Sequence, residues 1–201
     1  MNHKRLIAGG CSFTYGSELS DVGNDHTVSK NTWAYLLRDN DLLDDYICTA
    51  KPGSGNDAIA RRTFRAVADL DPQQIACVTV MWTFVSRYDW AMPRHKLLDQ
   101  SRWAYISPWD TSAGQLEAYR TLAGSEIQQQ AWANKSVEAR ETGVKPFAEA
   151  IYRYAANDYH ETFLSWKSII WLQNILEKIK IPYMFTLSDN SLFYKEMAHK
   201  K

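Results

Sequence analysis

The chain has 201 residues, which is enough for one well-packed domain and short for two. Its 23 lysine and arginine residues equal its 23 aspartate and glutamate residues, so no net charge favours nucleic acid or an anionic membrane as a partner. No apolar run approaches the roughly 18 residues that span a bilayer, no secretory leader is evident and three cysteines lack metal-ligand spacing, so we expect a cytoplasmic protein that binds no metal.

The first expected element is a short buried strand over 4–10, an apolar run closed by two glycines. Apolar residues at helical spacing then predict a helix over 31–43, with Asn31 as its N-cap. A second short strand is expected over 45–50, where the chain runs into a glycine-rich loop.

The next helix is predicted over 56–70, with Asn56 or Asp57 as its cap. The stretch 73–85 is a continuous apolar and β-branched run, as expected of a strand that is covered on both faces.

The section 86–145 shows weak periodicity and is rich in aromatic residues, and we interpret it as an insertion within one domain spanning 1–201. It serves either as a substrate-binding lid or as a small aromatic core of its own. The stretch 147–180 predicts one long helix, or two joined near Asn157, and 181–189 predicts a last buried strand.

Strands and helices alternate in this order of elements, which predicts an α/β fold. We expect a three-layer α/β/α sandwich with a mainly parallel, flavodoxin-like sheet. In such sheets reactive groups gather where the strands end. Three predicted strands end in unusual loops: "GGCSFT", "KPGSGND" and "MWTFVSR".

Ser12 stands on the turn after the first strand, where its hydroxyl would be exposed and backbone N–H groups would point toward the same space. Such amides stabilise the oxyanion that forms when a serine attacks an acyl group. The alternative is that Gly9 and Gly10 only form a turn and Ser12 caps the following helix.

In the second loop, Gly53 and Gly55 let the backbone approach a ligand closely, and Asn56 supplies a side-chain donor that suits an oxyanion hole. The alternative is a glycine turn in which Asn56 is an ordinary helix cap.

These blocks resemble the SGNH (GDSL-like) hydrolases, and most of all a divergent branch from tailed-phage genomes that begins Gly-Cys-Ser-Phe-Thr. The resemblance covers the first ninety residues and about 147–190. It implies that Ser12 is the nucleophile, with Cys11 in place of the usual Asp, and that the Gly53 amide joins the oxyanion hole.

The third block of that family, normally Gly-x-Asn-Asp, is degenerate here and reads Met-Trp-Thr at 81–83. Either Thr83 replaces the Asn as a donor, or Asn56 takes over its role. Trp82 and Arg87 are candidate substrate contacts, Arg87 for an anionic group, although a surface ion pair would also explain the arginine.

Attack by serine needs a general base, which the family takes from an Asp-x-x-His block near its C-terminus. This chain has no such block, and His199 is the histidine placed where that base would come from. His26, in the polar loop after Ser12, could also swing over the site. A truncated chain, or a fold kept for binding after catalysis was lost, explains the gap equally well.

Two hypotheses follow. The first is an SGNH-like serine hydrolase, without cofactor, that acts on a small ester or an acylated glycan. The second is a non-catalytic binding or virion-associated protein, whose "PGSGND" loop holds a phosphate or carboxylate and whose tryptophans contact a glycan or a protein. If phage-encoded, it would act in the host cytoplasm or the virion. A nucleotide enzyme is a third option, although the usual glycine-rich phosphate motifs are missing.

Overall fold

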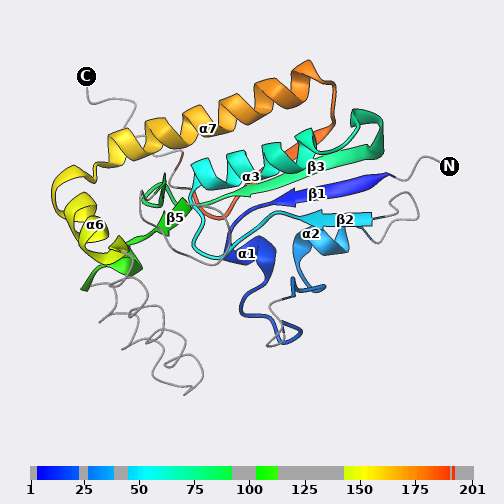
Figure 1. Cartoon of the computed structure of the whole chain (residues 1–201). Coiled ribbons are helices and arrows are strands. Elements are labelled where there is room, and N and C mark those ends of the chain that lie inside the picture. The colour runs from blue at the N-terminus through cyan, green and yellow to red at the C-terminus, as the bar shows by residue number, and fades with distance from the viewer. Residues whose placement is uncertain are drawn as a thin grey trace.

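The computed structural model of the chain describes residues 4–22, 27–38, 45–91, 103–112, 143–190 and 192. Within these residues the chain forms a four-stranded parallel sheet and a separate two-stranded antiparallel hairpin (Figure 1).

The parallel sheet contains the four strands that the sequence predicts, in the order β2-β1-β3-β6. Their bounds are β1 Arg5–Gly9, β2 Asp45–Cys48, β3 Ile75–Trp82 and β6 Tyr183–Leu187. In register, Ala8 pairs with Cys48 on one side and with Thr79 on the other. Because all the strands are parallel, their carboxyl ends meet at one edge, and the predicted α/β class is confirmed.

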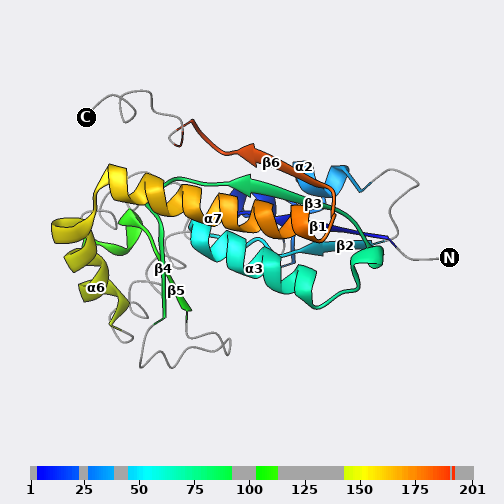
Figure 2. The same cartoon turned by 90° about the horizontal axis from the view of Figure 1, so that it is seen from above.

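Helices cover both faces of this sheet. Helices α3 (Asn56–Ala68) and α7 (Asp158–Lys178) lie side by side on one face, and the short α1 (Ser12–Tyr15) and α2 (Trp33–Leu36) lie on the other (Figures 1 and 2). Side chains alternate between faces along a strand, so Ile47 packs toward α3 and α7, whereas Tyr46 meets Tyr35 of α2 edge to face at 5.2 Å.

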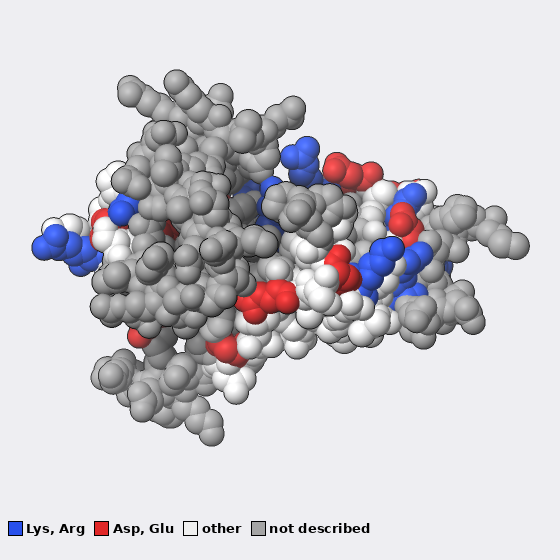
Figure 3. All heavy atoms as spheres, turned by 90° about the horizontal axis from the view of Figure 1, so that it is seen from below, with Lys and Arg blue, Asp and Glu red and all other residues white. Residues whose placement is uncertain are grey.

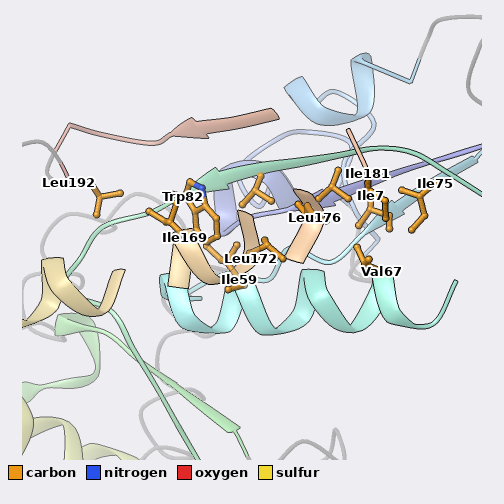
Figure 4. Packing of buried hydrophobic residues seen from close by; sticks show 13 residues of the cluster. Ile7, Ile59, Val67, Ile75, Trp82, Ile169, Leu172, Leu176, Ile181 and Leu192 are labelled. Carbon is orange, nitrogen blue, oxygen red and sulfur yellow. The ribbon is translucent and has the colours of Figure 1, made fainter. Parts of the chain in front are cut away.

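The main core lies between the sheet and the pair α3 and α7 (Figure 4). Its strand residues Ile7, Val78 and Val80 and its helix residues Leu172 and Leu176 are fully buried. Burying a side chain of this size contributes about 1.5–3 kcal/mol, so this apolar layer fixes how the sheet and helices pack.

The helix boundaries differ from the predictions in detail. Thr32, rather than Asn31, caps α2 by accepting from the Tyr35 amide at 3.2 Å, and the described helix is one turn long. Gly55 is the N-cap of α3, so neither Asn56 nor Asp57 caps it.

The predicted helical stretch 147–180 is divided, as one of the two alternatives foresaw. Helix α6 (Val144–Ala150) continues into a π-helical turn, η3 (Ile151–Ala155), before α7 begins. The Asn157 side chain accepts from the Tyr159 and His160 amides and so caps α7.

The section 86–145 contains an antiparallel hairpin that the sequence does not predict, formed by β4 (Tyr88–Ala91) and β5 (Trp103–Ile106). A short 3₁₀ turn, η2 (Pro108–Asp110), follows β5, and another, η1 (Pro72–Gln74), precedes β3 outside this section. The hairpin packs with α6 around a second, smaller cluster that includes Ile106, Val144 and Ala148. Four-residue strands rich in aromatic side chains give little periodicity, which explains why the hairpin is hidden. Residues 92–102 and 113–142 of this section lie outside the described residues.

None of the described helices is long and apolar enough to cross a membrane. On the face that carries α1 and α2, acidic and basic side chains of the described residues lie among one another (Figure 3).

Candidate functional site

The order in which strands are added to the sheet reverses at β1. From β1 the chain passes to β2 on one side, and β3 then adds on the other side. In open α/β sheets ligands bind outside the strand ends at such a switch point. The three loops singled out in the sequence follow β1, β2 and β3 at the carboxyl edge of the sheet.

Ser12 is the first residue of α1, and Cys11 is its N-cap. A Cβ on Gly10 would lie 2.1 Å from the Thr14 hydroxyl oxygen, so this turn requires glycine for close packing. Ser12 is half-buried, and its hydroxyl forms no hydrogen bond with any group in the described part of the chain. The serine thus stands on a tight turn, as predicted, without a base beside it among those residues.

The loops after β1 and β3 touch through Cys11 and Thr83, which are both buried. The Thr83 hydroxyl donates to the Cys11 sulfur at 3.3 Å and accepts from the Arg87 guanidinium at 3.1 Å. Cys11 is fully buried, as a small apolar residue would be. Arg87 also lies over the Phe84 ring at 5.0 Å, and no described carboxylate forms an ion pair with it.

Asn56 joins the start of α3 to the end of β3. Its amide nitrogen donates to the Thr83 carbonyl and to the Ser165 hydroxyl, both at 3.0 Å, and its oxygen accepts from the Thr83 amide at 2.8 Å. The side chain is 3% exposed. Because both amide hydrogens are used inside the protein, the oxyanion role predicted for the Asn56 side chain does not fit this arrangement.

The loop after β2 runs beside the end of β1, since the Lys51 amide donates to the Gly10 carbonyl at 3.3 Å. Gly53 has a φ of 79°, a left-handed conformation that favours glycine. A Cβ added at this position would meet only the Tyr105 Cβ, at an ordinary contact distance of 3.9 Å. A Cβ on Gly55 would lie 2.4 Å from the Arg87 carbonyl oxygen. The second and third loops are therefore packed closely together.

Trp82 does not contact solvent as a substrate-binding residue would. It is 1% exposed and packs edge to face on Phe185 at 5.2 Å within the main core. The last residue of a central strand points inward here, so its prediction as a substrate contact is corrected.

The two histidines predicted as possible bases, His199 and His26, lie outside the residues that the structure describes. His160, the histidine within the described residues, is exposed on α7. Asp189 follows β6, and the third residue after it is Leu192, which is 4% exposed and belongs to the main core.

A cavity of about 160 Å³ lies beside this contact network and is lined by both Asn56 and Arg87. Two of its carboxylates were missed by sequence reasoning. Glu161 is buried and accepts from the Tyr88 hydroxyl at 2.5 Å. The Asp89 side chain is fully buried and pairs with Arg61 at 2.6 Å.

Burial governs the ionisation of this cavity wall. It raises the pKa of Asp89 to about 6, although the Arg61 guanidinium acts in the opposite direction. Burial, together with the Glu161 carboxylate, raises the pKa of Tyr88. Glu161, Ser165 and Ser168 are spaced helically on the buried side of α7, and that polar stripe is the sequence pattern that could have revealed this wall.

Among the described residues, no group of three or more histidine, cysteine or acidic side chains is arranged to hold a metal ion. Compared with protein-family models, with curated proteins and with solved structures, the chain gives no match.

Proposed function

We propose that the protein is a serine hydrolase of the SGNH-like type, acting on an ester through Ser12. The observation that carries this proposal is the Thr83–Cys11 contact, which joins the loops after β1 and β3 at the switch point next to Ser12. The Lys51–Gly10 hydrogen bond adds the third loop to the same edge.

In the proposed reaction the Ser12 oxygen attacks the acyl carbon while its proton passes to a base. The backbone amides of Ser12 and Gly53 stabilise the oxyanion, and Asn56 holds β3 against α3 so that these loops keep their places. The alcohol leaves with the proton, and water then cleaves the acyl-enzyme to release the acid. His199 is the base that the family resemblance suggests.

Arg87 supports a polar substrate. Its guanidinium lines the cavity and is held by Thr83, and no described carboxylate forms an ion pair with it. A charge held beside a cavity in this way attracts an acyl or alcohol group that carries hydrogen-bond acceptors.

The test is covalent labelling with a fluorophosphonate probe, together with hydrolysis of p-nitrophenyl acetate. We expect the wild-type protein to be labelled at Ser12 and the Ser12→Ala variant to lose both labelling and hydrolysis without loss of folding. Ser17→Ala, an exposed serine of the same segment, is the matched control and should keep both. Equal hydrolysis by Ser12→Ala and wild type would refute the proposal.

A second candidate, a binding protein without catalysis, is favoured by Leu192. This buried leucine is the third residue after Asp189, where the family's Asp-x-x-His block would have its histidine. If the fluorophosphonate labels no serine while the protein is folded, this candidate replaces the first.

A further inference from the structure

The cavity beside the contact network has the size of a small ligand. It lies between the start of α3, the segment after β3 and the first half of α7. One water needs about 10–15 Å³ of such space, so a cavity of about 160 Å³ accommodates roughly a dozen non-hydrogen atoms, as in one monosaccharide.

A buried acceptor in the wall has no partner. Asp89 places one carboxylate oxygen on Arg61, at 2.6 Å from its Nη2 and 3.2 Å from its Nε. The other oxygen is buried and forms no hydrogen bond in the described part of the chain. Buried polar atoms in native proteins are nearly always hydrogen-bonded, so this oxygen calls for a donor from a ligand or water.

Groups of both charges surround the cavity. The carboxylates of Asp57, Asp89 and Glu161 line it together with the cationic groups of Arg87 and Lys167, and Arg61, outside the lining, pairs with Asp89. A wall with both acceptors and donors favours a neutral ligand with many hydroxyl groups over a strongly charged one.

An aromatic ring stands in the same wall. Trp90 lines the cavity, is 51% exposed and packs edge to face on Phe147 at 5.2 Å. An indole combines a flat apolar face with a polar N–H. The wall thus combines a flat ring, buried acceptors and cationic donors, which is the combination that a sugar ring with its apolar face and hydroxyl edge requires.

We propose that this cavity binds one sugar unit of a glycan, with Trp90 against the ring and the Asp89 and Glu161 carboxylates accepting from its hydroxyl groups. This inference rests on the proposed function, because it makes the ester one carried by a carbohydrate. The cavity and the serine are joined by two contacts: Arg87 bonds to Thr83, and Thr83 bonds to Cys11, the residue before Ser12.

The test measures binding apart from hydrolysis. The full-length Ser12→Ala variant is titrated with glucose, galactose, N-acetylglucosamine, maltotriose, cellotriose and chitotriose, by saturation-transfer NMR and calorimetry, with inorganic phosphate and spermine as charged comparisons. We expect at least one sugar to bind and Trp90→Ala to weaken that binding by about tenfold or more.

Tyr159→Ala, which removes an exposed aromatic side chain that does not line the cavity, is the matched control and should leave the affinity unchanged. Lys167→Ala, on the exposed side of α7, is a second cavity variant should Trp90→Ala disturb the hairpin. It should also weaken binding.

The proposal is overturned if no sugar of the panel binds, if only phosphate or spermine binds, or if both cavity variants bind sugar as tightly as their parent. Failure of the proposed hydrolase looks different: sugar binding that depends on Trp90, in a wild-type protein that no fluorophosphonate labels, would retain the sugar site and remove the catalysis.

Discussion

The parallel sheet and the β4–β5 hairpin are held in place by different forces. The sheet packs on α3 and α7 through a continuous apolar cluster. The hairpin has a smaller cluster and is fastened to α3 by two arginines: Arg61 pairs with Asp89 and lies 4.0 Å from the Trp103 ring, and Arg62 donates to the Tyr105 hydroxyl at 2.9 Å. Apolar burial therefore holds the parallel sheet in place, and polar contacts hold the hairpin, whose strand β4 lines the cavity.

The largest effect on stability is expected when a tryptophan is replaced by alanine in each of the two regions. Trp82→Ala removes a tryptophan that is 1% exposed and should cost about 3–5 kcal/mol of unfolding free energy, because it leaves a large cavity in the core. Trp90→Ala removes one that is 51% exposed and should cost less than about 1 kcal/mol. Urea unfolding of both variants measures the contrast, and similar losses would contradict the difference between the regions.

The next effect concerns a polar contact inside the apolar region. Asn56→Ala leaves the buried Thr83 amide and carbonyl without their partner and should cost about 2 kcal/mol. Asn174→Ala, at an exposed position of α7, is the control and should change stability by less than about 0.5 kcal/mol. If Asn56→Ala is as stable as the control, the reciprocal hydrogen bonds do not hold β3 against α3.

Much of the sheet could be predicted from the sequence because its strands are apolar runs, so each one signals its own burial. The meeting of Cys11 and Thr83 also follows in outline, since parallel strands end at a common edge. The hydrogen-bond partners of the Asn56 side chain could not be predicted, because they lie 27 and 109 residues away in the sequence. A local helix cap and a long-range bridge look the same in one sequence.

In the hairpin, we expect the stability contributed by Asp89 to depend on pH. The pKa of Asp89 is raised to about 6, so the folded state binds a proton between pH 6 and 4 that the unfolded chain does not. Stability contributed by this group therefore increases as the pH falls from 7 to 5, by about 1.4 kcal/mol. The measurement is the difference in unfolding free energy between wild type and Asp89→Asn at the two pH values. Parallel profiles would show that Asp89 titrates normally.

The smallest predicted effect on stability comes from a comparison of Gly53, in the loop at the sheet edge, with Gly143, at the start of α6. Gly53 and Gly143 both have a φ of 79°, and a Cβ at either position meets no atom closer than 3.9 Å. Gly53→Ala and Gly143→Ala should therefore each cost about 1 kcal/mol, from backbone strain alone. Alanine keeps the backbone N–H, so the strain acts by displacing this amide. If the Gly53 amide serves the oxyanion, only Gly53→Ala should also slow fluorophosphonate labelling of Ser12. Equal labelling rates at equal stability would show that displacing Gly53 does not affect the site, since the strain is matched and only the position differs.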